Sequence, residues 1–215
     1  MSIVNNVAVY GIEDSFRRAK YPYIIDPDKA NADFTDGLKK LAKSHKGEGH
    51  DQFLTGIIVQ FDLTFSVKAW IELERYHFID FISSQSTMHR ITKFNVRDQY
   101  NDYVDPRVIE IMEEKIAQYN EVSELAKNIP ADDKYNQERY ANWLRQKYLE
   151  ILYTNPAGFE LTARLTTNYR CLLNIYIQRY DHRLPEWREF CQYIYDNLPM
   201  FKELVEAYNS GKCKI

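Results

Sequence analysis

The sequence predicts an α+β fold, a helix-rich single domain spanning residues 1–215 with a small sheet. One segment, Gly56–Phe65, has the alternation of apolar and polar residues that is typical of a half-buried strand. The second half of the chain instead repeats apolar residues every three or four positions, which is the period of an amphipathic helix. A strand region followed by helices is characteristic of an α+β domain. The length of 215 residues, set against about 150 for a typical domain, favours one elaborated domain.

The first half should contain few regular elements. Its first 50 residues are polar and irregular, and we expect loops there with one short helix at about Thr35–Ser44. After the strand, Ser66 stands where a helix N-cap would, and the run SVKAWIELERYHFIDFI predicts a helix over 66–82 because Trp70, Leu73 and His77 recur at helical spacing.

The second half should be helical almost throughout. Asp105 and Pro106 form an N-cap followed by a proline at the first helical position, and they predict a helix to about Asn128. Further helices are expected at these places: one through Tyr140 and Ile151 that ends near Asn155, one over Thr162–Arg179, one that begins at Pro185, and a short one after Pro199.

Composition and charge narrow the functional classes. With 45% hydrophobic and 27% charged residues the chain should form a globular core. The formal net charge of −3 gives no global positive field, so we expect no nucleic-acid polymer as partner. We also expect no membrane partner and a cytoplasmic location, because no run of about 18 apolar residues and no signal peptide stands in the sequence.

Cysteine, histidine and glycine patterns exclude several kinds of site. The cysteines are Cys171, Cys191 and Cys213, and without a C-x-x-C pair they indicate neither a disulfide framework nor a zinc knuckle. His77 and Asp80 share a predicted helix but lack a third ligand at a diagnostic spacing, so no metal site is predicted. The 7 glycines form neither a dinucleotide-binding fingerprint nor a phosphate-binding P-loop.

The most informative segment is Ala163–Phe190. Here Asn168, Arg170 and Asn174 interrupt an otherwise apolar run, and Arg179 stands near the end of the expected helix. Burying such groups without partners is costly, so they should meet acceptors in the protein, across a subunit interface, or in a ligand.

This pattern resembles the flavin-dependent thymidylate synthases. That family carries N-x-R-x-x-x-N-x-x-x-x-R, with a proline twelve residues before the first Asn. The matching residues here are Pro156, Asn168, Arg170, Asn174 and Arg179. Upstream, Phe65–Tyr76 resembles the family helix that precedes an R-H-R-x-x-S motif, with Lys68 and Arg75 in matching places. The resemblance is strongest in 57–91 and 156–198.

The chain also departs from the family pattern. The R-H-R positions are Ile79, Asp80 and Phe81, so the arginines that usually contact flavin are absent. Leu152 stands where the family usually has a substrate-binding arginine. The run SSQSTMHR retains Ser84, Ser86 and Arg90, and it resembles the family's nucleotide-phosphate loop if one residue is gapped.

The resemblance implies a role for each matching residue. Arg179 would be the catalytic residue that faces the pyrimidine of dUMP, and a cation there favours the ionised ring whose C5 must react. The implied cofactor-binding residues are Asn168, Arg170, Asn174 and His50. The implied substrate-binding residues are Arg90, Ser84, Ser86, Arg75 and Tyr76.

The implied reaction is methyl transfer to C5 of dUMP, giving dTMP. In the family, methylenetetrahydrofolate supplies the carbon, reduced FAD supplies the hydride, and NADPH reduces the flavin again. The active sites of the family are shared within a homotetramer. The alternatives are a related enzyme that modifies C5 of a pyrimidine deoxynucleotide, for example by hydroxymethylation, and a non-catalytic, oligomeric homologue that binds a nucleotide.

Overall fold

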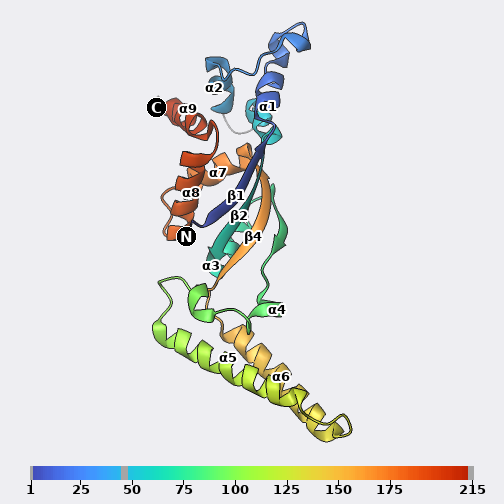
Figure 1. The fold of residues 1–215 in the computed structure, drawn as a ribbon. Coiled ribbons are helices and arrows are strands. Elements are labelled where there is room, and N and C mark those ends of the chain that lie inside the picture. Colours follow the sequence, from blue (N-terminus) through green and yellow to red (C-terminus); the bar gives the residue numbers. More distant parts are fainter. Residues whose placement is uncertain (1, 45–47, 213–215) are drawn as a thin grey trace. The chain divides into compact units, whose positions relative to one another are not determined.

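The computed structural model describes residues 2–44 and 48–212 (Figure 1). Cys213 therefore lies outside the described residues. The strands are β1 (Val4–Tyr10), β2 (Ile58–Ser66), β3 (Ile79–Ser84) and β4 (Glu160–Asn168). The α-helices are α1 (Ile12–Arg18), α2 (Asp36–Ala42), α3 (Val67–Leu73), α4 (Thr87–Arg90), α5 (Pro106–Lys127), α6 (Lys134–Thr154), α7 (Tyr169–Arg179), α8 (Pro185–Asn197) and α9 (Phe201–Lys212). Short 3-10 helices are η1 (Tyr21–Tyr23), η2 (Pro27–Lys29), η3 (His50–Gly56) and η4 (Val96–Gln99).

The four strands form one sheet in the order β1-β2-β4-β3. β1 pairs antiparallel with β2, with Val4 opposite Leu63 and Val9 opposite Val59. Along β2 every second side chain is buried, which confirms the strand that the alternating pattern predicts. The helix-rich α+β fold class is likewise confirmed.

The chain divides into two compact units. The first comprises residues 1–64, 71–83 and 163–215, and the second comprises 65–70 and 84–162. The expectation of one domain remains a prediction.

The first unit has an aromatic core beneath the sheet. Trp187, Tyr169, Phe190 and Phe201 are fully buried, and the rings of Phe61 on β2 and Phe190 on α8 lie 5.6 Å apart. Each such side chain contributes roughly 1.5–3 kcal/mol when it leaves water. Packing against β2 holds α8 alongside the sheet (Figure 1), while α7 contacts α8 and η3.

The second unit is built around the long pair of helices α5 and α6, which lie side by side (Figure 1). Asp105 caps α5 by accepting a hydrogen bond from the backbone N–H of Arg107 at 2.9 Å, as the Asp-Pro pair predicts. The core of the unit is a cluster of buried residues: Ile91, Val96, Tyr100, Met112, Ile116, Ile151 and Phe159. The predicted helices at 105–128 and around 140–155 are thus confirmed.

Two predicted helices are partly wrong. Ser66 does act as a cap, since its Oγ accepts the N–H of Ala69 at 3.3 Å, but α3 ends at Leu73 and residues 79–84 form β3. Phe78, at a positive φ of 66°, marks the break between the two elements. Because strand pairing supplies backbone partners that no local pattern reveals, sheet formation here overrides a helical spacing of apolar residues.

The second error concerns residues 162–168, which form the end of β4 instead of the start of a helix. Ala163, Leu165 and Thr167 are buried while their neighbours are half-buried, which is the period of a strand. The helical spacing of apolar residues begins only at Tyr169, where α7 starts. Within the first 50 residues, β1 and α1 were also missed, whereas the short helix near Thr35 is confirmed as α2.

Candidate functional site

A cavity of about 590 Å³ lies in the first unit, where three segments meet. One wall comes from η3, a second from the residues that follow α3, and a third from the end of β4 and one face of α7. The lining residues are Gln52, Thr55, Arg75, Tyr76, His77, Phe78, Asn168, Arg170, Cys171, Asn174 and Gln178. Five residues that the sequence marks as site residues therefore line one cavity, although nearly 100 positions of chain separate the two groups.

The junction of β4 and α7 positions three of them. Asn168 is the N-cap of α7, and its Oδ1 accepts the backbone N–H of Cys171 at 3.0 Å. The cap starts the helix immediately after the strand, so Arg170 falls in its first turn. Asn174 follows one turn later on the same face. This geometry explains why the N-x-R-x-x-x-N spacing gathers all three side chains at one cavity.

Arg170 is paired with an acidic residue of η3. Its Nε donates to Oδ2 of Asp51 at 2.9 Å, and the two side chains are largely buried. Oδ1 of Asp51 is buried and has no hydrogen-bond partner among residues 2–44 and 48–212. The ion pair therefore reduces the positive charge that Arg170 presents to the cavity, while one acidic oxygen remains unsatisfied.

The second wall is held in place by hydrogen bonds to its backbone. Thr167 Oγ1 donates to the carbonyl of Phe78 at 2.7 Å, and the buried thiol of Cys171 donates to the carbonyl of His77 at 3.3 Å. Burial raises the pKa of this thiol, which makes Cys171 an inert packing residue. Arg75 on the same wall is exposed, and in the part of the chain that is described it forms no ion pair.

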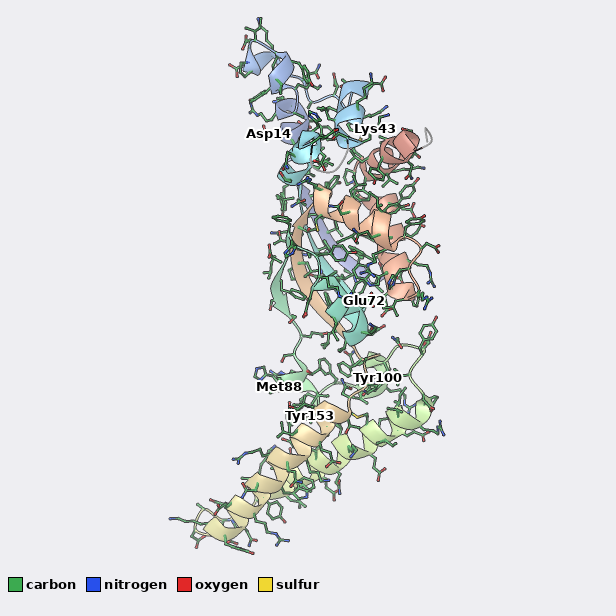
Figure 2. All side chains as sticks on the ribbon, turned by 180° about the vertical axis from the view of Figure 1, so that it is seen from behind. Asp14, Lys43, Glu72, Met88, Tyr100 and Tyr153 are labelled. Carbon is green, nitrogen blue, oxygen red and sulfur yellow. The ribbon has the colours of Figure 1, made fainter. Side chains whose placement is uncertain are left out.

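Arg179 does not line the cavity but lies directly behind Tyr76. Its Nε donates to the Tyr76 hydroxyl at 2.8 Å, and its Nη1 lies 3.0 Å from Oε2 of Glu72. Glu72 stands near the end of α3, where Figure 2 labels it. The guanidinium stacks on the buried ring of Trp187, at 5.1 Å from the ring centroid, and Nε2 of His182 lies 2.7 Å from Nη1. The predicted catalytic cation is thus held in an ionic and aromatic cluster one residue removed from the cavity.

Burial and the Arg179 guanidinium shift the pKa of the Tyr76 phenol in opposite directions. Burial raises the pKa of the Tyr76 phenol, and the hydrogen bond from Arg179 opposes that rise. The net pKa remains above the ordinary value, so the hydroxyl keeps its proton at neutral pH and needs an acceptor for it. That acceptor is Oε1 of Gln178, at 2.9 Å.

Four other predicted site residues lie elsewhere. His50 lines a neighbouring hollow of about 480 Å³ between α1 and η3, which shares Gln52 and Thr55 with the cavity. Ser84, Ser86 and Arg90 belong to the second unit, around the short helix α4. Arg90 is exposed there and makes no ion pair among the described residues, as a phosphate-binding cation would require.

Sequence reasoning missed several residues of the site. Asp51 and Glu72 pair with the two motif arginines, and Gln178 and His182 stand on either side of Arg179 in the sequence. No spacing pattern marks the acidic partners, because they come from other segments. The sequence does contain a pattern that marks Gln178: it lies four residues after Asn174 and therefore on the same face of α7.

Residues 2–44 and 48–212 contain no group of three or more His, Cys, Asp or Glu residues that could hold a metal ion. None of their helices has the length and apolar character needed to cross a membrane.

The four-stranded sheet and the helices around it form a fold similar to that of the flavin-dependent thymidylate synthases. Two solved structures that share it are both of thymidylate synthase X from Helicobacter pylori, determined with FAD and dUMP. One has a TM-score of 0.64 at 12% identity and covers 95% of this chain and 98% of that chain. The other has a TM-score of 0.58 at 13% identity and covers 96% and 98%. No family model and no curated protein matches the sequence.

Proposed function

We propose that the chain is a flavin-dependent thymidylate synthase that transfers a methyl group to C5 of dUMP. The observation that carries this proposal is the convergence of Arg75, Tyr76, Asn168, Arg170 and Asn174 on one cavity. The likeness in fold to enzymes solved with FAD and dUMP supports it. Methylenetetrahydrofolate as carbon donor, NADPH as reductant and a homotetramer with shared active sites are parts of the same proposal.

The residues of the cavity fit a flavin ring at one edge. Oδ1 of Asn168 accepts the hydrogen bond that caps the helix, so the amide hydrogens of Asn168 remain for a ligand. Arg170 and Asn174 lie on the same wall. Donors of this kind match the carbonyl oxygens of an isoalloxazine. When bound, FAD would supply the hydride of the reaction. A volume of about 590 Å³ also lies within the roughly 300–1,000 Å³ of small-molecule sites.

The other residues would bind and polarise the nucleotide. Arg179 supplies a fixed positive charge behind Tyr76, which favours the anionic form of the pyrimidine. Ser84, Ser86 and Arg90 would hold the 5′-phosphate, and Arg75 would provide a further cation at the cavity wall. Guanidinium groups suit this role because they remain charged and can donate two parallel hydrogen bonds.

One observation favours a second candidate, a non-catalytic homologue that binds a nucleotide. Both motif arginines already have carboxylate partners, Arg170 in Asp51 and Arg179 in Glu72. Those carboxylates weaken the positive potential that an anionic flavin or pyrimidine would need. A nucleotide could bind through the amide groups alone without being converted.

Flavin retention distinguishes these candidates. The purified protein is incubated with FAD, with or without dUMP, and its flavin absorbance is recorded after free flavin has been removed. We expect a retained flavin band that dUMP strengthens and that Asn174→Ala weakens. The matched control is Asn142→Ala, which changes an exposed asparagine of α6 outside the cavity. Protein that retains no flavin under either condition would exclude the flavin-dependent reaction.

A further inference from the structure

Two amide side chains of the cavity, those of Asn168 and Gln178, already use their oxygen atoms as acceptors, so their N–H donors remain for a ligand. Asn168 accepts a backbone N–H through Oδ1, which leaves its amide hydrogens, and Arg170 has only donors. Oε1 of Gln178 accepts a hydrogen bond from the Tyr76 hydroxyl, so the amide hydrogens of Gln178 also remain for a ligand. Thr55 offers an acceptor instead, because its hydroxyl donates to the carbonyl of Gln52 at 2.6 Å and keeps its lone pairs for a ligand.

The orientation of Gln178 follows from a directed chain of hydrogen bonds. Glu72 accepts from Nη1 of Arg179, Arg179 donates from Nε to the Tyr76 oxygen, and Tyr76 donates to Gln178. An arginine cannot accept a hydrogen bond, so the proton of Tyr76 cannot point back toward Arg179. It points to Oε1 of Gln178, and the amide nitrogen of Gln178 is therefore the polar atom left for the cavity.

The ion pair of Glu72 and Arg179, where this series of hydrogen bonds starts, is largely buried. The side chains of Arg179 and Glu72 are only 16% and 12% exposed, and the guanidinium lies against the rings of Trp187 and Tyr76 at 5.1 and 5.6 Å. Breaking the ion pair would leave a buried charge uncompensated, so the direction of the chain is costly to reverse. The ion pair thus orients a side chain that reaches the cavity two residues away.

We propose that Gln178 is a specificity-determining residue, which donates its amide N–H to a ring carbonyl and so selects a 2,4-dioxopyrimidine over a 4-aminopyrimidine. This inference rests on the proposed function for the identity of the site. Tyr76, Arg179 and Glu72 act as positioning residues for Gln178. The 2,4-dioxopyrimidine edge occurs both in uracil and in the isoalloxazine of a flavin. Gln178 would recognise the ring carbonyl oxygen that the two ligands share.

The selectivity has a simple physical origin. Uracil presents a carbonyl oxygen at C4, where cytosine presents an amino group. An amino group against the amide N–H of Gln178 places two donors face to face, and both lose the partners they had in water. Sites built on such a hydrogen bond reject the mismatched ligand more strongly than apolar pockets reject a change in size.

The test measures dissociation constants for dUMP and dCMP by calorimetry in the wild type and in Gln178→Glu. The substitution is isosteric, and one glutamate oxygen can still accept the hydrogen bond from Tyr76. The other oxygen then presents an acceptor to the ligand where the amide N–H was a donor. We expect the wild type to prefer dUMP by about tenfold or more, and the variant to lose or reverse that preference. The two nucleotides carry the same phosphate, so their ratio isolates the base.

A matched control and a second variant keep the test decisive. Gln146→Glu makes the same change on an exposed residue of α6 outside the cavity, and its dUMP to dCMP ratio should equal that of the wild type. Tyr76→Phe removes the hydroxyl that orients Gln178, so the amide is free to turn. This variant should lose the preference for dUMP while it still binds both nucleotides.

Binding of FMN, measured in the same proteins, separates the two sources of the dioxopyrimidine. If Gln178→Glu alters only the nucleotide ratio, Gln178 reads the substrate; if it weakens only FMN, Gln178 reads the flavin. Unchanged nucleotide ratio and unchanged FMN affinity would overturn the inference, as would the absence of binding by any of these ligands. Selective binding without formation of dTMP would sustain the inference and refute the proposed reaction.

Discussion

The Arg179 side chain belongs to a buried cluster and also contacts the wall of the cavity through Tyr76. Its guanidinium is buried against Trp187 and paired with Glu72, while its Nε reaches Tyr76 at the cavity wall. The motif spacing singles out Arg179 in the sequence, although its side chain does not line the cavity. It could not show that the charge is already compensated, because Glu72 comes from a segment more than 100 positions away.

Glu72→Gln should lower the free energy of unfolding by about 3 kcal/mol, because it leaves the Arg179 charge buried without a counterion. Urea titrations of Glu72→Gln, Arg179→Gln and the double variant give the coupling between the two residues. Strictly additive effects would show that the pair contributes nothing as a pair.

Cys191 is a buried thiol of α8. Burial raises the pKa of its thiol from an ordinary value near 9 to about 12. A pKa raised in the folded state means that stability is complete below about pH 9 and is lost as the pH rises toward 12, since the unfolded chain releases the proton first.

The measurement is the free energy of unfolding between these two pH values. Cys191→Ala should show a slope shallower than that of the wild type, by up to about 1.4 kcal/mol per pH unit. The buried tyrosines contribute equally in both proteins and cancel in the comparison. Identical slopes would mean that Cys191 does not titrate differently on folding.

Among the elements, η3 is the one that builds a cavity wall without any regular pattern in its sequence. It supplies Asp51 to Arg170 and two lining residues, Gln52 and Thr55, and it packs against α1 and α7. Its last residue, Gly56, lies against Gly11, the N-cap that precedes α1 in the left-handed conformation at φ 79°. Two glycines thus allow the close approach of α1 to this wall.

A glycine substitution tests this contact. Gly11→Ala should destabilise the protein by about 1–2 kcal/mol for the left-handed conformation, and by more because the new Cβ would lie 2.5 Å from the carbonyl oxygen of Gly56. Gly37→Ala in α2 is the control, since its Cβ would meet only ordinary contacts; it should be neutral or stabilising by up to about 1 kcal/mol. Equal thermal shifts in the two variants would contradict the account.

The elements show where sequence patterns suffice. Helix α5 was predictable because a cap, a proline and a long apolar stripe all agree, and β2 because its alternation is strict. β3 was not predictable, since its stability comes from pairing with β4, and five of its six residues are exposed. β1 likewise depends on a distant partner, β2. Local signals find elements that stabilise themselves, and they miss strands that need a neighbour.

At the scale of the whole molecule, the positions of the motif residues were predictable and their partners were not. Five predicted site residues line one cavity, whereas the predicted ligand His50 lines a neighbouring hollow. The carboxylates that neutralise Arg170 and Arg179 follow from tertiary structure alone. The phosphate-binding residues Ser84, Ser86 and Arg90 remain predictions of the resemblance.

Oligomeric state is the prediction that belongs to the molecule as a whole. The proposed function implies a homotetramer, because the active sites of the family are shared between subunits. Light scattering coupled to size-exclusion chromatography should give four times the mass of the chain across a tenfold dilution. A monomer at every concentration would contradict the shared active site while leaving the fold unaffected.

The most direct test of the central claim is the formation of dTMP. The purified protein is incubated with dUMP, methylenetetrahydrofolate, FAD and NADPH, and the nucleotides are separated by chromatography. The proposal predicts dTMP that depends on each component and disappears in Arg179→Ala. The control Arg107→Ala changes an exposed arginine of α5 and should leave the yield unaltered. A protein that retains both FAD and dUMP but forms no dTMP would contradict the proposed reaction.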